Sequence, residues 1–103
     1  MYNKQKLSNL NKMDGLAPDV MKAFWAFDKA SVADGVIPGK YKELIAVAVA
    51  LITQCPYCID IHNGNARKAG ATDAEIVEAA MVAASLAAGA VVTHATHTLR
   101  LEP

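Results

Sequence analysis

Two alanine-rich apolar runs, at residues 44–52 and 79–92, are the feature that most limits what this chain of 103 residues can fold into. Alanine and leucine favour helix, and the first run continues a segment of good helix formers, Lys40-Tyr41-Lys42-Glu43. Both runs are apolar on every side, yet both are shorter than the roughly 20 residues needed to span a bilayer. We therefore expect two core helices. A domain of this size has too little interior to surround both, so part of their surface is expected to pack against another copy of the chain.

Prolines, a glycine and a capping motif predict where helices begin and end. Pro18 and Pro56 each suit the first position of a helix, because that position needs no backbone N–H donor. A helix running through Pro56 would clash with its ring, so the preceding helix is expected to end near Thr53. Gly70 is expected to end the helix that Pro56 begins. The segment Thr72-Asp73-Ala74-Glu75 has the spacing of a capping box, which predicts a further helix start.

The predicted organisation is a single helical domain over residues 16–103, preceded by an N-terminal arm at residues 1–15 to which we assign no chemistry. Gly89 is expected to bend or break the last long helix. Three aromatic residues, Phe24, Trp25 and Phe27, are expected to belong to the core, and the alternative is that they wall the entrance for a substrate.

Composition limits the partners and the compartment. Lysine plus arginine equal aspartate plus glutamate at 10 each, so no basic surface points to nucleic acid or to a membrane as a partner. The first residues, MYNKQKLSNLNKM, lack the apolar stretch and small-residue cleavage site of a secretory signal, and we expect a cytoplasmic protein. The two cysteines form the segment Cys55-Pro56-Tyr57-Cys58. A lone close pair inside the cell indicates redox or metal chemistry rather than a disulfide framework.

Glu43, Cys55, Cys58 and His62 are predicted to form one thiol-based catalytic site. At a helix start, Cys55 would take the cap position, where backbone N–H groups and the positive end of the helix dipole favour a thiolate. Cys58 follows one turn later on the same face and His62 one turn after that, which brings an imidazole beside the sulfur. If the helices before and after Thr53 fold back as a hairpin, Glu43 falls opposite about residue 64, close to the level of His62. The expected proton relay runs from Glu43 through His62 to Cys58.

Two other interpretations of the cysteines stay open from the residues alone. One is a structural zinc site made by Cys55, Cys58 and His62, with His94 or His97 as a further ligand. The other is a non-enzymatic assembly module in which the cysteines are buried, inert small hydrophobes. His94 and His97 lie near a helix C-terminus, where positive charge is favoured, and they are more simply interpreted as exposed polar residues.

These residues resemble the signature of the AhpD-like alkylhydroperoxidases within the carboxymuconolactone decarboxylase superfamily. The resemblance covers about residues 14–100 and extends into the segments that flank the site, which are Lys42-Glu43-Leu44-Ile45-Ala46, Ile61-His62, Ala66-Arg67-Lys68-Ala69-Gly70-Ala71, and Thr72 with Glu75. It implies an all-α, AhpD-like helical fold that forms an obligate homo-oligomer, either a trimer or a hexamer.

The resemblance also implies roles for the site residues. Cys58 would be the peroxidatic cysteine and Cys55 the more exposed resolving cysteine, with His62 and Glu43 as the proton relay. The implied activity is that of a peroxidase or thiol-disulfide oxidoreductase, with a small hydroperoxide or disulfide as oxidant and a dithiol or lipoylated protein as reductant. No metal or organic cofactor is expected. The alternative within the superfamily is a carboxymuconolactone decarboxylase-type lyase, whose chemistry needs no close cysteine pair.

Overall fold

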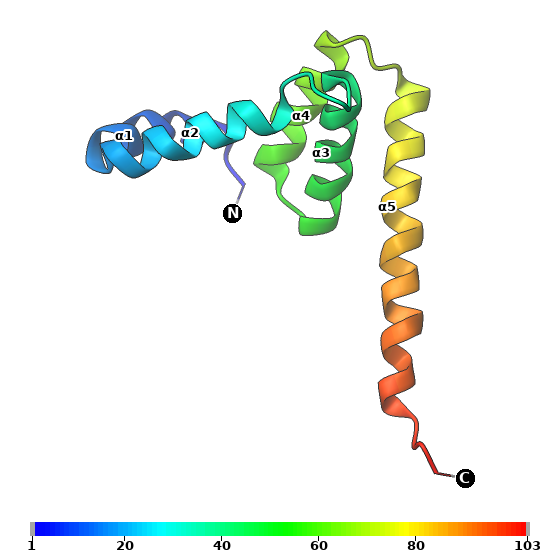
Figure 1. Cartoon of the computed structure of the whole chain (residues 1–103). Coiled ribbons are helices and arrows are strands. Elements are labelled where there is room, and N and C mark those ends of the chain that lie inside the picture. Colours follow the sequence, from blue (N-terminus) through cyan, green and yellow to red (C-terminus); the bar gives the residue numbers. More distant parts are fainter. Residues whose placement is uncertain (1, 103) are drawn as a thin grey trace.

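The computed structural model describes residues 2–102, which form helices and connecting turns with no β-strand in that range (Figure 1). The elements are η1 (Lys4–Ser8), α1 (Asn9–Leu16), α2 (Pro18–Val32), α3 (Gly39–Thr53), α4 (Pro56–Lys68), α5 (Asp73–His94) and η2 (Ala95–Thr98), where η denotes a 3₁₀ helix. The predicted all-α class is confirmed. In Figure 1, α3 and α4 form a central hairpin, α1 and α2 extend to one side, and α5 runs down the other.

The predicted break between the two central helices is confirmed. α3 ends at Thr53 and α4 begins at Pro56. Gln54 adopts the left-handed conformation, with φ of 55°, that reverses the chain. The N–H of Cys55 then donates to the carbonyl of Ala50 at 3.1 Å, which closes the turn. Because the reversal is this short, α3 and α4 must run antiparallel and in contact.

The buried core lies where α3, α4 and the beginning of α5 meet. Leu44, Ala66 and Ala71 form its buried cluster, and Ile76 and Ala79 of α5 pack against it. Ala66 is fully buried, and its small methyl side chain packs with Leu44 of α3 in this cluster. This close contact fixes the register of α3 against α4, and that register places the candidate site.

The α1–α2 pair leaves its aromatic side chains partly in solvent. The indole N–H of Trp25 donates to the Asp14 carboxylate at 2.6 Å and joins the two helices. Phe24 is 48% exposed and Phe27 is 71% exposed. The expectation of a core position is therefore wrong for Phe24 and Phe27, whereas Trp25 is half-buried.

α5 is a single helix of 22 residues that extends well beyond the core (Figure 1). It continues through Gly89, so the expected bend or break there is wrong. One glycine costs a helix only about 1 kcal/mol, and alanine flanks it on both sides. The expectation that residues 79–92 form a buried core helix also fails within one chain, since Val82, Leu86 and Val91 are 60%, 68% and 71% exposed.

The apolar run at residues 79–92 is by itself too short to cross a membrane, but α5, which contains it, is longer. By length and composition alone, the helical segment Asp73–Thr98 is apolar enough to do so, with a mean hydropathy of 1.9 over an 18-residue window within it. The count from residue 79 omitted the first turns, which include Ile76 and Val77. A core helix that other protein surface covers has the same length and composition.

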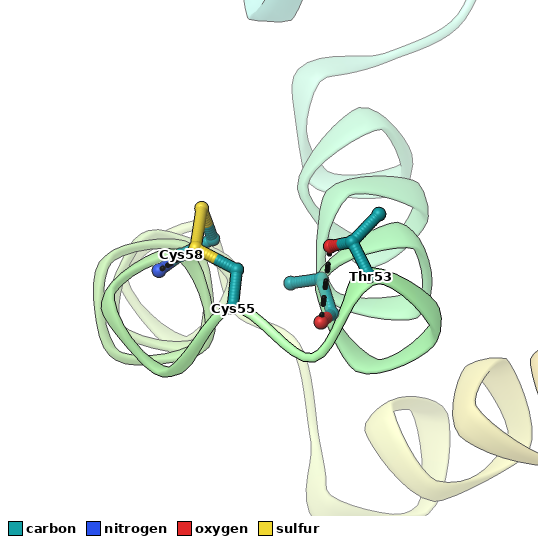
Figure 2. Close-up of a disulfide and its surroundings, with 4 residues drawn as sticks. Thr53, Cys55 and Cys58 are labelled. Carbon is teal, nitrogen blue, oxygen red and sulfur yellow. Dashed lines mark hydrogen bonds between the residues drawn. A yellow bond between two sulfur atoms is a disulfide. The ribbon is translucent and has the colours of Figure 1, made fainter. Parts of the chain in front are cut away.

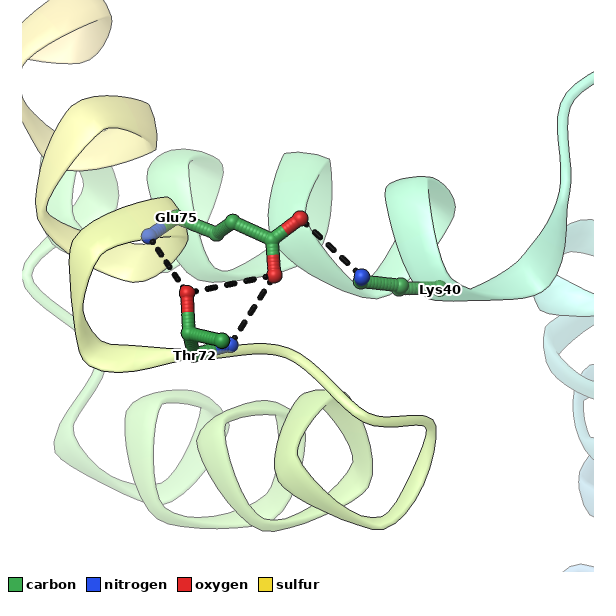
Figure 3. Close-up of polar contacts among 3 residues, drawn as sticks. All are labelled: Lys40, Thr72 and Glu75. Atoms are coloured by element: carbon green, nitrogen blue, oxygen red, sulfur yellow. Dashed lines mark hydrogen bonds and ion pairs between the residues drawn. The ribbon is translucent and has the colours of Figure 1, made fainter.

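Three residues fix the beginning of α5 and tie it to α3 (Figure 3). The Thr72 hydroxyl accepts from the Glu75 N–H at 3.2 Å, and the Glu75 carboxylate accepts from the Thr72 N–H at 3.0 Å, which confirms the predicted capping box. Lys40, in the first turn of α3, forms an ion pair with Glu75 at 3.0 Å. The Thr72 backbone N–H, and after it Lys40, lower the pKa of Glu75 below its ordinary value of 4.5.

We predict that Thr72→Ala lowers the free energy of unfolding by about 1 kcal/mol in urea titrations, because the helix loses its cap.

Glu75→Gln keeps the capping hydrogen bond and removes only the charge. Since the pKa of Glu75 is lower in the folded than in the unfolded protein, its charge stabilises the fold above pH 4.5, and this contribution is lost as pH falls through the folded pKa. The stability difference between the wild type and Glu75→Gln should vanish in acid, and a difference independent of pH would contradict this account.

Candidate functional site

Cys55 and Cys58 form a disulfide at the beginning of α4, close to the end of α3 (Figure 2). Cys55 occupies the N-cap, as predicted, and its sulfur accepts a hydrogen bond from the Cys58 N–H at 3.3 Å. The two Cα atoms lie 5.3 Å apart, within the usual range for a bridged pair. Both cysteines are half-buried. They are therefore neither sealed in the core nor fully exposed, and the expected greater exposure of Cys55 stays a prediction.

Glu43 and His62 meet across the α3–α4 hairpin. The Glu43 carboxylate lies 2.6 Å from Nδ1 of His62, and the two side chains are only 10% and 20% exposed. A carboxylate has no proton to donate, so Nδ1 of the imidazole carries the hydrogen and donates it to Glu43. This arrangement leaves Nε2 as the ring nitrogen that can exchange a proton with another group.

Cys58 and His62 line two cavities whose other walls are largely different. The first, of about 400 Å³, lies against the α3 face formed by Ile45, Ala46 and Val49. The second, of about 500 Å³, is here named the arm cavity because residues of η1 and α1 form one of its walls. Cys55 lines neither cavity. The geometry thus gives a small molecule access to Cys58 and to the imidazole together.

The N-terminal arm, to which the sequence assigned no chemistry, lies against the site. The N–H of Asn3 donates to the Tyr57 hydroxyl at 3.0 Å. The rings of Tyr2 and Tyr57 contact edge to face, with their centroids 4.8 Å apart. The Tyr2 hydroxyl donates to the Asp60 carboxylate. The recurrence of Leu7, Leu10 and Met13 at spacing three predicts a short arm or a fraying helix here, and the structure has the helices η1 and α1, in which Leu7 and Leu10 are half-buried and Met13 is exposed.

His94 and His97 lie apart from the cysteines. They occupy the end of α5 and η2, with ring centroids 5.8 Å apart, and Figure 1 places this end of the chain far from α4. The proposed four-ligand zinc set is therefore not assembled within this chain. Across residues 2–102, no three histidine, cysteine, aspartate or glutamate side chains gather where they could hold a metal ion.

A sequence model described as the carboxymuconolactone decarboxylase family matches residues 18–100, which is most of the chain. The chain belongs to this family. The match begins at the first residue of α2, so that η1 and α1 lie outside the matched region. The predicted family membership is thereby confirmed.

Individual relatives agree with this assignment. An uncharacterized protein in the cox locus of Paracoccus denitrificans is 51% identical over 77 residues, which are 75% of this chain and 69% of the relative. An alkyl hydroperoxide reductase of Mycobacterium tuberculosis is 38% identical over 60 residues, which are 56% of this chain and 17% of that protein. This second similarity supports the AhpD-like branch of the family.

Solved structures share the fold. A protein from Methanobacterium thermoautotrophicum has a TM-score of 0.78 at 34% identity, covering 84% of this chain and 97% of that chain. A carboxymuconolactone decarboxylase family protein from Legionella pneumophila has a TM-score of 0.76 at 35% identity, covering 81% of this chain and 74% of that chain. The helical arrangement of this chain is therefore that of the family.

We predict that the neutral imidazole of His62 carries its proton on Nδ1, because Glu43 accepts a hydrogen bond from that atom. Nitrogen-15 NMR of the histidine rings distinguishes the two neutral tautomers. Glu43→Gln offers an amide oxygen and should keep the Nδ1–H form, whereas Glu43→Leu should abolish the preference. The signals of His97 serve as an internal control that neither substitution should shift. An Nε2–H tautomer of His62 in the wild type would contradict the geometry.

Proposed function

We propose that this protein is a thiol-dependent oxidoreductase of the alkylhydroperoxidase type, which reduces organic hydroperoxides or disulfides through Cys55 and Cys58. Glu43 and His62 act as its proton relay. The observation that carries the proposal is the 2.6 Å hydrogen bond from His62 to Glu43, on an imidazole that shares two cavities with one sulfur of a disulfide. A nucleophile, an oriented base and room for a substrate are the parts that such a reaction needs.

In the oxidation step, Nε2 of His62 takes the proton of the Cys58 thiol. The Cys58 thiolate attacks the terminal oxygen of a hydroperoxide, ROOH, so that an S–O bond forms and the O–O bond breaks. His62 returns the proton to the leaving alkoxide, which becomes ROH, while Cys58 becomes a sulfenic acid. The Cys55 thiol then attacks that sulfur, forming the disulfide and releasing water.

In the reduction step, a dithiol exchanges with the Cys55–Cys58 disulfide through a mixed disulfide and leaves both cysteines as thiols. The complete cycle converts ROOH and a dithiol into ROH, water and the oxidised dithiol. A disulfide substrate would replace the hydroperoxide by accepting the same thiolate attack. The similarity to the mycobacterial alkyl hydroperoxide reductase supports the hydroperoxide as oxidant.

Magnitudes explain why the relay matters more than an acidic cysteine. Lowering a thiol pKa from about 8.5 to about 6.5 raises the thiolate fraction at neutral pH roughly 25-fold. The less basic thiolate is also a weaker nucleophile, which lowers its rate of attack roughly 8-fold. Positioned proton transfer contributes on the order of 100- to 10,000-fold. Glu43 and His62 should therefore dominate the rate. A lyase reaction would leave the paired cysteines without a part in the chemistry, which favours the redox function.

We predict that His62→Ala lowers kcat for hydroperoxide reduction by on the order of 100-fold or more, since the alkoxide loses its proton donor. Glu43→Gln should lower kcat in the same direction by a smaller factor. The rate of cysteine alkylation in the reduced protein, at a pH where the thiols are ionised, should change little in either variant. Steady-state kinetics with a dithiol reductant and iodoacetamide labelling provide the two measurements.

His97→Ala is the matched control, because it removes an imidazole in η2 that touches neither cavity. Its kcat should equal that of the wild type. If His62→Ala slowed turnover and alkylation by the same factor, the histidine would act on the thiol alone and the relay would be refuted.

We also propose that copies of this chain cover one another's α5 helices in a homo-oligomer. Val82, Leu86 and Val92 of α5 expose apolar side chains to solvent, and exposed apolar surface of this kind is typical of protein–protein contacts. A trimer or hexamer, as the family resemblance implies, would bury them.

We predict that the wild-type chain is oligomeric in detergent-free buffer and that Leu86→Glu shifts it toward the monomer, because burying an unpaired carboxylate is costly. Light scattering coupled to gel filtration measures the mass. Val36→Glu, at a fully exposed position between α2 and α3, is the control and should leave the mass unchanged. A wild-type monomer, or a chain that stays in solution only with detergent, would contradict the proposal.

A further inference from the structure

The arm cavity is apolar and reaches the proposed reacting sulfur. Its volume is about 500 Å³, and Cys58 and His62 belong to its lining. Three parts of the chain supply its apolar walls, namely Leu7 and Leu10 of the arm, Phe24 and Trp25 of α2, and Ile61 of α4. A molecule with an apolar body could therefore rest in the cavity while its reactive end meets the sulfur.

Specific contacts hold the arm, of which the structure describes residues 2–15, in place at both ends. At one end, Asn3 and Tyr2 contact Tyr57, which lies between the two cysteines in sequence. At the other end, Asp14 accepts the hydrogen bond from the indole of Trp25 at 2.6 Å. The arm is thus tied to α4 and to α2, the two helices that supply the remaining walls.

The arm lies outside the region matched by the family model, which begins at residue 18. Without it, the cavity would lose the Leu7 and Leu10 wall and open to solvent. The charges near the cavity do not favour an anionic ligand, since Lys6 and Asp28 carry opposite signs. Apolar contact is therefore what the arm adds.

We infer that the arm is the specificity-determining wall of the site, and that it selects hydroperoxides whose organic group is bulky and apolar, such as an aromatic or branched alkyl group. This inference rests on the proposed function and uses the same reaction, in which ROOH becomes ROH. Apolar area removed from water stabilises the bound R group. Hydrogen peroxide has no such group and gains nothing from the wall.

The test compares cumene hydroperoxide with hydrogen peroxide, using dithiothreitol as reductant and the full chain. Leu10→Asp should lower kcat/KM for cumene hydroperoxide about tenfold, mainly through KM, and change it less than about twofold for hydrogen peroxide. Leu16→Asp makes the same substitution in α1 at a side chain that is 84% exposed and outside the cavity lining, and should change neither value. Leu10→Ala should reproduce the selective loss more weakly. Equal losses for both peroxides in Leu10→Asp, or no loss, would overturn the inference.

A second measurement does not depend on turnover. With Cys58 as the remaining thiol in a Cys55→Ser background, Leu10→Asp should slow labelling by the apolar reagent N-phenylmaleimide about tenfold and leave iodoacetamide labelling unchanged. If the wild type reduces neither peroxide, the proposed function fails, and this labelling ratio alone decides whether the arm forms a selective apolar wall. An unchanged ratio of the two labelling rates would overturn the inference that the arm forms a selective apolar wall.

Discussion

The short reversal between α3 and α4 is the constraint on which the rest of the structure depends. Two residues, 54–55, separate a helix that must end before Pro56 from one that begins on it, and Gln54 turns the chain in the left-handed conformation. The two helices consequently run antiparallel with Ala66 buried between them. That contact sets the register in which Glu43 meets His62, and it also brings the disulfide to a helix beginning where small molecules can reach it.

The central part of the fold and the site could be predicted because local chemistry dictates them. Proline geometry fixed the helix boundary at Pro56, and capping chemistry fixed the beginning of α5 at Thr72. Counting residues across the reversal placed Glu43 level with about residue 64, and its partner is His62, within the same helical turn. The roles of these residues in catalysis and the division into an arm and one domain remain predictions.

The exposure of α2 and α5 could not be predicted. Helical periodicity shows that a helix has an apolar face, but it does not show whether another part of the protein covers that face. The exposed aromatic side chains of Phe24 and Phe27 carry the same apolar pattern as a core helix. α5 likewise looks like a core helix in sequence but extends away from the only core that the described residues form. The arm was assigned no chemistry because its contacts with Tyr57 and Asp60 join residues more than 50 positions apart in sequence.

The most direct test of the account is peptide mass spectrometry of the reduced chain after one equivalent of cumene hydroperoxide. The account predicts that the peptide containing both Cys55 and Cys58 loses two hydrogens. In Cys55→Ser it predicts the gain of one oxygen on Cys58, which a reagent for sulfenic acids should trap. No change in mass, or oxygen added to Cys55 while Cys58 stays a thiol, would contradict the claim that Cys58 is the attacking sulfur.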